Sequence, residues 1–163
     1  DRAASRLIAP LLSTPHSAIA LGFAFLILPS GWIVRLISPD LTGWTRPPGN
    51  IVTVGDPLGL AFLAGLLLKE VPYLVLMMIG ASNQVPVAQA LAVSRALGHR
   101  GPAAWLKAVL PQIYPQIRLP LYAVLAFSLS TVDVAIILAP GQPPPLSVLA
   151  ARWFSDYDLS LYP

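Results

Sequence analysis

The chain has 163 residues, of which 56% are hydrophobic and 10% are charged, and its net charge is +3. A soluble domain carries about 25% charged residues, so this chain cannot cover itself with a polar surface, and most of it is expected to lie in a membrane. The small, scattered positive charge argues against nucleic acid as a partner, and the lack of cysteine excludes disulfides and thiolate metal sites.

The first predicted transmembrane span is residues 17–38. As a helix it is about 33 Å long, enough for a hydrocarbon core of about 30 Å. Pro29-Ser30-Gly31 lies in its middle and is expected to kink it. Arg35, near its end, is expected to reach the membrane interface. The polar connector 39–56 follows, and Trp44 within it is typical of the aromatic belt at a membrane surface.

The second predicted span, 57–81, carries Lys69 and Glu70 at its middle, followed by Pro72. A charge at the bilayer centre costs roughly 2.5–3.5 kcal/mol, so the protein or water must screen this pair. One kinked helix is the simpler interpretation, and two half-spans are the alternative. The third predicted span, 117–138, begins near Arg118 and contains Asp133.

Residues 86–111 lie between the second and third spans and are too polar to cross the membrane. We predict two short helices joined at Gly98, which ends the first helix because glycine tolerates a positive φ. Pro102 suits the first position of the second helix, and Leu110-Pro111 closes the unit. This segment holds Arg95, Arg100 and Lys107 and no acidic residue.

The distribution of basic residues predicts the orientation of the chain. Lys and Arg are enriched in cytoplasmic loops, and placing 86–111 in the cytoplasm puts Arg2, Arg6 and Arg118 on the same side. Segments 39–56 and 139–158 then lie outside the cell. We therefore predict a multi-pass protein whose loop 86–111 faces the cytoplasm.

This loop resembles the signature loop of permease subunits of binding-protein-dependent ABC importers. That signature is a Glu-Ala-Ala triplet, followed at fixed distances by Gly and by an Ile-x-Leu-Pro sequence. The spacing is the same here, although an alanine replaces the glutamate. The positions that correspond to the signature are Ala92, Val93, Ser94, Gly98, Ala108, Leu110 and Pro111.

The flanking segments KEVPY (69–73) and STVDVAIILAPGQPPP (130–145) resemble the same family. They are most similar to permeases of thiamine-like importers, which are relatives of the ferric-iron and polyamine systems. The resemblance implies an all-α membrane protein, a fragment of a multi-span permease with about three transmembrane helices plus a cytoplasmic helix–Gly–helix coupling loop. Because the chain begins without methionine, we interpret it as a piece of a longer protein, most of one permease half.

By this resemblance, the chain forms part of a substrate pathway in the bacterial inner membrane and is not an enzyme. The loop 86–111 docks on cytoplasmic ABC ATPase subunits. An extracytoplasmic solute-binding protein delivers the solute, which is thiamine or a related small molecule. A second permease half and membrane lipid complete the expected partners, and no cofactor or metal is implied. The chain lacks a phosphate-binding P-loop and is not expected to hydrolyse ATP itself.

Several alternatives remain at this point. The loop could instead be a pair of interfacial helices resting on the membrane. For Lys69 and Glu70 we favour a structural role in an ion pair with partners elsewhere, for example Asp133 or Arg118, over contact with substrate. Asp133 itself is either such a partner or a cation-attracting group in the pathway. A membrane-embedded enzyme that uses Lys69, Glu70 and Asp133, and a membrane protein with only a structural role, are the alternative functions.

Overall fold

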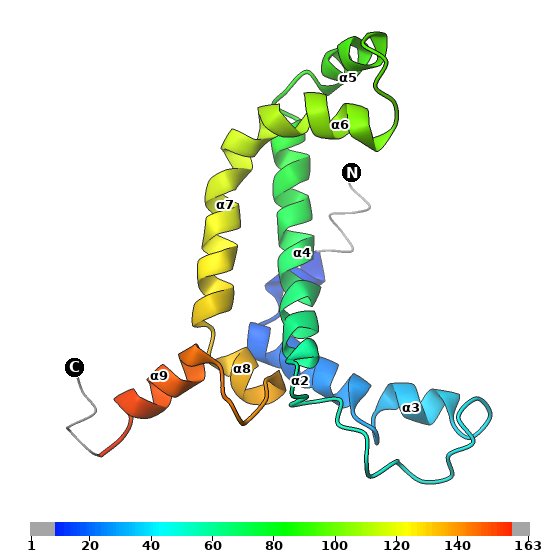
Figure 1. Cartoon of the computed structure of the whole chain (residues 1–163), viewed down its shortest axis with the longest axis vertical. Coiled ribbons are helices and arrows are strands. Elements are labelled where there is room, and N and C mark those ends of the chain that lie inside the picture. The colour runs from blue at the N-terminus through cyan, green and yellow to red at the C-terminus, as the bar shows by residue number, and fades with distance from the viewer. Residues whose placement is uncertain (1–8, 158–163) are drawn as a thin grey trace. The chain divides into compact units, whose positions relative to one another are not determined.

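The computed structural model describes residues 9–157, and every regular element in that range is an α-helix (Figure 1). Two helical segments, His16–Ile37 and Leu60–Ser82, are long and apolar enough to cross a membrane. These findings support the predicted all-α membrane class, while the number of crossings stays a prediction. Arg2 and Arg6, which the orientation argument counts, lie outside the described residues, as does the end of the predicted segment 139–158.

The described chain divides into two compact units. Residues 70–127 form the loop unit, which contains the segment 86–111. Residues 9–69 and 128–157 form the terminal unit. Helix α4 (Leu60–Ser82) belongs to both, since it begins in the terminal unit and ends in the loop unit.

The first predicted span is divided between α2 (His16–Ile27) and α3 (Trp32–Ile37). Gly31 explains where the chain breaks. A Cβ atom on this residue would lie 2.8 Å from the carbonyl oxygens of Leu26 and Leu28, so a larger residue does not fit the turn. The expected kink at Pro29-Ser30-Gly31 is therefore present, but as an interruption of the helix and not as a bend within it.

Helix α4 runs without interruption through Pro72, which favours the single helix over two half-spans. Its first turn is held by Asp56, at the end of the preceding connector. The two carboxylate oxygens of Asp56 accept hydrogen bonds from the backbone N–H groups of Ala61, at 2.9 Å, and Leu60, at 2.8 Å. Both groups lack intrahelical partners, so Asp56 caps the helix.

Replacing Asp56 is expected to destabilise the start of α4 in a pH-dependent way. The hydrogen bonds from Ala61 and Leu60 lower the pKa of the Asp56 carboxyl below its ordinary value of 3.8. Its stabilisation is therefore fully present above that value and is lost as the pH falls through the lower folded-state pKa. At neutral pH, Asp56→Ala should lower the melting temperature more than Asp56→Asn does, because asparagine still accepts a hydrogen bond.

Thermal unfolding of the three proteins across this pH range checks the prediction. The difference between the unchanged protein and Asp56→Ala should narrow in acid, because the neutral carboxyl accepts weaker hydrogen bonds than the carboxylate does. A difference that stays constant down to full protonation of the carboxyl would show that the charge of Asp56 does not stabilise the helix.

The third predicted span, 117–138, does not form one helix, and this prediction of its bounds was wrong. Helix α7 (Leu110–Ser130) begins earlier, and α8 (Asp133–Leu138) follows after a break. Leu110-Pro111 begins α7 and does not close the loop, because proline is well tolerated in the first turn of a helix. One more short helix, α9 (Leu146–Phe154), follows α8.

The core of the terminal unit lies where α2, α4 and α8 meet. Small residues on α2 and α4 allow close packing, as is usual between helices in membranes. At Gly65 of α4, a Cβ atom would overlap the side chain of Leu138, which is fully buried. The buried members of this cluster are Ala20, Ala24, Leu66, Val134 and Leu138.

The core of the loop unit joins the short helices of 86–111 to the two long ones. Its fully or nearly buried residues come from the end of α4, the residue that follows α6 and the start of α7, namely Ala81, Val109, Ile113 and Ile117. Apolar residues from the segment 86–111 pack against this cluster, among them Val87, Leu91 and Trp105. The loop is therefore anchored to the ends of α4 and α7 by side-chain packing and not only by chain connectivity.

Candidate functional site

The segment 86–111 contains α5 (Val87–Ala96) and α6 (Pro102–Ala108). The turn between them has Gly98 at φ +86° and Gly101 at φ +56°. Pro102 stands at the start of α6. The predicted secondary structure of two helices around Gly98 agrees with the structure, whereas the role of the segment stays a prediction.

Backbone hydrogen bonds at the end of α5 explain why a glycine stands at position 98. The N–H of Gly98 donates to the carbonyl of Arg95 at 3.0 Å, and the N–H of His99 donates to the carbonyl of Ser94 at 3.1 Å. This pair of bonds is the Schellman motif, which needs a left-handed residue after the helix. The turn thus sets the angle at which the chain leaves α5.

The predicted docking residues of the first triplet differ in exposure. Ser94 is 4% exposed and donates a hydrogen bond to the carbonyl of Ala104 in α6, at 3.5 Å. Ala92 is exposed, and Val93 is 62% exposed. Ser94 therefore holds the two helices together, whereas Ala92 and Val93 are available to a partner.

The remaining predicted docking positions also divide into exposed and partly buried residues. Gly98 is exposed, with open space where a side chain would be, and Ala108 is half-buried at the end of α6. Leu110 is half-buried and Pro111 exposed, and both lie in the first turn of α7. They position the junction between the loop and the long helix.

An open groove of about 500 Å³ runs over this part of the loop unit, and we call it the docking groove. Its lining combines three of the predicted docking residues with neighbours from α5, the turn and α6. Leu97 adds a large apolar side chain that is 73% exposed. The residues used below are Val93, Ser94, Leu97, Lys107 and Ala108.

The chemistry of the docking groove indicates what could occupy it. Val93 and Leu97 offer exposed apolar surface, which is unfavourable in water without a partner. Lys107 lines the groove, Arg95 and Arg100 lie on the same segment, and the segment 86–111 has no acidic residue. A complementary surface would therefore present apolar side chains bordered by carboxylates.

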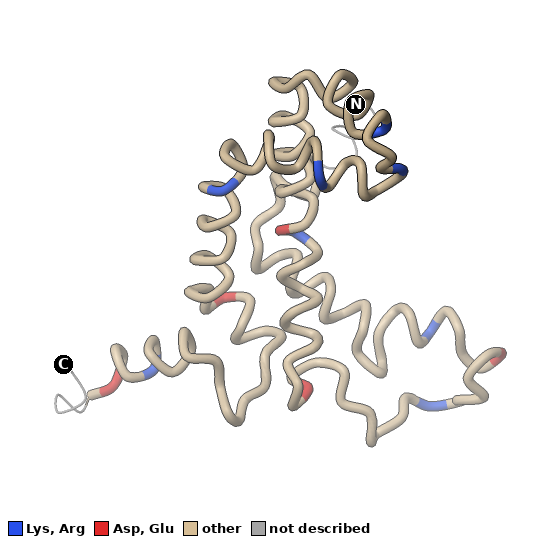
Figure 2. Tube along the Cα trace, turned by 45° about the horizontal axis from the view of Figure 1, so that its top comes forward, with Lys and Arg blue, Asp and Glu red and all other residues tan. Residues whose placement is uncertain are grey.

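The three polar residues singled out by the sequence, Lys69, Glu70 and Asp133, differ in burial. Lys69 and Glu70 are each 8% exposed in the middle of α4, where Figure 2 shows an adjoining blue and red segment. The ammonium group of Lys69 donates a hydrogen bond to the backbone carbonyl of Thr14, just before α2. Asp133 is exposed in the first turn of α8, and Arg118 is exposed on α7.

The described contact of Lys69 is thus a backbone carbonyl and not one of the carboxylates suggested as a partner. Thr14 follows a helical turn at residues 9–13. Carbonyls at the C-terminal end of a helix lack intrahelical donors, so this one can accept a hydrogen bond from the lysine in place of a carboxylate. Sequence reasoning missed Thr14, because a backbone acceptor leaves no signal in the residue type. Within residues 9–157, no group of three or more His, Cys, Asp or Glu residues could hold a metal ion.

Comparison with known proteins gives one informative similarity. No protein-family model and no solved structure matches the chain. The chain is 32% identical over 149 residues to the inner membrane ABC transporter permease protein YnjC of Escherichia coli (strain K12). The similar region covers 91% of this chain but 27% of YnjC, so the chain spans about a quarter of the length of that relative.

Proposed function

We propose that this chain forms part of the transmembrane permease of an ATP-driven importer, starting from its similarity to an ABC transporter permease protein of a bacterial inner membrane. That similarity supports assignment to the ABC permease family, a membrane location and a role other than catalysis. The two apolar helical segments, His16–Ile37 and Leu60–Ser82, also support the membrane location. The direction of transport and the proteins that act with this chain belong to the proposal.

The observation that carries the proposal is the packed junction of the loop unit. The docking groove lies on α5 and α6, and these helices pack through Val87, Leu91 and Trp105 on a cluster that includes Ile113 and Ile117 of α7. A force applied to the loop by a docked ATPase would therefore reach the long helix α7 through closely packed side chains. Rigid-body movement of this kind is how helices couple distant sites.

The proposed partners follow from this arrangement. Cytoplasmic ATPase subunits would occupy the docking groove and contact Ala92, Val93, Leu97 and Gly98. An extracytoplasmic solute-binding protein would deliver substrate to the other side of the membrane, and a second permease half would complete the pathway. The proposed substrate is thiamine or a related small cation, with Asp133 as the candidate group that attracts it. A ferric-iron or polyamine permease of the same family is the alternative.

Replacing Lys69 distinguishes the proposed transporter from the alternative, a membrane-embedded enzyme. Its ammonium group is buried and bonded to the Thr14 carbonyl, which is a structural role. We expect Lys69→Gln to lower thermal stability, because a hydrogen bond from a charged donor contributes about 1.5–3 kcal/mol. The molecules that remain folded should still stimulate ATP hydrolysis by their ATPase subunits.

The measurement is permease-stimulated ATP hydrolysis per folded molecule, beside a thermal melt. The control is Arg152→Gln, which replaces an exposed basic residue of α9 outside the docking groove. Loss of all biological function in Lys69→Gln, with stability and stimulated ATP hydrolysis unchanged, would favour a chemical role for this lysine.

A further inference from the structure

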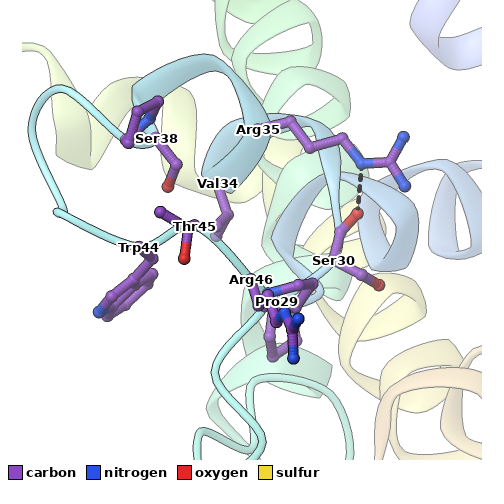
Figure 3. Close-up of a pocket in the computed structure, with 10 residues that line it drawn as sticks. Pro29, Ser30, Val34, Arg35, Ser38, Trp44, Thr45 and Arg46 are labelled. Atoms are coloured by element: carbon purple, nitrogen blue, oxygen red, sulfur yellow. Dashed lines mark hydrogen bonds between the residues drawn. The ribbon is translucent and has the colours of Figure 1, made fainter.

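A second pocket lies in the terminal unit, between α3, the turn before it and the connector that follows it (Figure 3). Its volume is about 410 Å³. Hydroxyl groups, an aromatic ring and two guanidinium groups line it. The members used below are Ser30, Arg35, Ser38, Trp44, Thr45 and Arg46, and we call it the arginine pocket.

The two arginines of this pocket have unused capacity for hydrogen bonding. The Nε of Arg35 donates to the carbonyl of Ser30 at 2.8 Å, which fixes the side chain against the turn and leaves its terminal N–H groups available. Within residues 9–157, neither Arg35 nor Arg46 has a carboxylate partner, and Asp40, the acid on the same connector, does not line the pocket. The pocket therefore has two positive charges and no negative one.

The position of the pocket along the chain indicates its depth in a membrane. It follows the apolar segment His16–Ile37, which is long enough to cross the hydrocarbon layer. On α3, Trp32 is 64% exposed and Leu36 is 76% exposed, so apolar surface lies beside the cationic pocket. Trp44 contributes an amphipathic ring of the kind that gathers at the headgroup level.

We propose that the arginine pocket binds the phosphate headgroup of an anionic phospholipid, whose acyl chains lie along the exposed apolar face of α3. Arginine is suited to this role because its planar guanidinium donates two parallel hydrogen bonds to phosphate oxygens. Thr45 adds a hydroxyl donor, whereas the hydroxyl of Ser38 is hydrogen-bonded to that of Thr42. The inference requires only that the segment 16–37 lies in the membrane, so it stands apart from the docking of an ATPase.

The test is the affinity of the purified protein for phosphatidylglycerol, measured by titration with native mass spectrometry in a neutral detergent. We expect phosphatidylglycerol to bind more tightly than phosphatidylcholine. Arg35→Gln with Arg46→Gln should weaken phosphatidylglycerol binding about tenfold or more, since charge-assisted hydrogen bonds to the phosphate are lost. The matched control is Arg100→Gln with Arg152→Gln, which removes the same charge from exposed sites outside the pocket and should keep the affinity.

A second variant distinguishes a loss of lipid binding from a loss of folding. Arg46→Gln removes no hydrogen bond described within residues 9–157, so it should keep the melting temperature and still weaken phosphatidylglycerol binding. An equal loss of affinity in the control pair would overturn the proposal in favour of unspecific surface charge. Displacement of the lipid by inorganic phosphate at matched concentration would overturn it in favour of a soluble anion. Unchanged affinity for phosphatidylglycerol in Arg46→Gln and in the double variant would show that the arginine pocket does not bind the lipid.

Discussion

Gly98→Trp is expected to abolish binding of the ATPase subunits and, with it, ATP-driven transport, while the protein still inserts into the membrane. The residue is exposed and has no heavy atom within 4 Å of the place where a Cβ would stand, so the folded loop has room for the ring. The indole would, however, project from the turn beside Val93 and Leu97, where the partner is proposed to contact the docking groove. Its φ of +86° adds strain of about 1–2 kcal/mol for any residue with a side chain.

The readout is co-purification of the ATPase subunits with the permease, beside the amount of inserted protein. Gly98→Ala separates the two effects, because it introduces the strain without the bulk and should weaken binding only in part. Gly22→Trp is the matched control, since Gly22 is also exposed with open space around it but lies on α2. Normal co-purification of Gly98→Trp would contradict docking at this turn.

Gly65→Val is expected to be the most disruptive change to the fold of the terminal unit. A Cβ at this position already overlaps the side chain of Leu138, which is fully buried in the contact between α4 and α8. Overpacking of this kind costs about 1–3 kcal/mol or more, so the melting temperature and the yield of folded protein should both fall. Gly80→Val is the control on the same helix, because Gly80 is exposed and has open space around it.

A compensating change tests whether this contact is the cause. Leu138→Ala alone should be destabilising by about 2–5 kcal/mol, as for other buried leucines. The double variant Gly65→Val with Leu138→Ala should lose less stability than the sum of the two single losses, because the alanine at position 138 makes room for the valine. Strict additivity of the two single effects would show that the residues do not interact in the folded protein.

The features that could be predicted from the sequence are those with a local cause. The apolar runs predict helices, and Gly98 with Pro102 predicts where α5 ends and α6 begins, because positive φ and a missing N–H are properties of single residues. The break at Gly31 was predicted as a kink for the same reason, although it interrupts the helix. The continuity of α4 through Pro72 was the simpler of two interpretations.

The features that could not be predicted depend on contacts between distant segments. Leu110-Pro111 was placed at the end of the loop, but it begins α7, because proline is tolerated in the first turn of a helix. The hydrogen bond from Lys69 to Thr14 joins residues far apart in the sequence, and its acceptor is a backbone atom. The shared pocket of Arg35 and Arg46 depends on how the connector folds back over α3.

The central claim, that the segment 86–111 is the docking surface for an ATPase, is tested most directly by site-specific cross-linking. The chain has no cysteine, so single-cysteine variants report on one position each. Val93→Cys, at a site that is 62% exposed in the docking groove, should give an adduct with the ATPase subunit when it carries a thiol-linked photoreactive group. Leu146→Cys, at an 82% exposed site in the segment predicted to lie outside the cell, should give none. An adduct from Leu146 alone, or equal adducts from both positions, would contradict the claim.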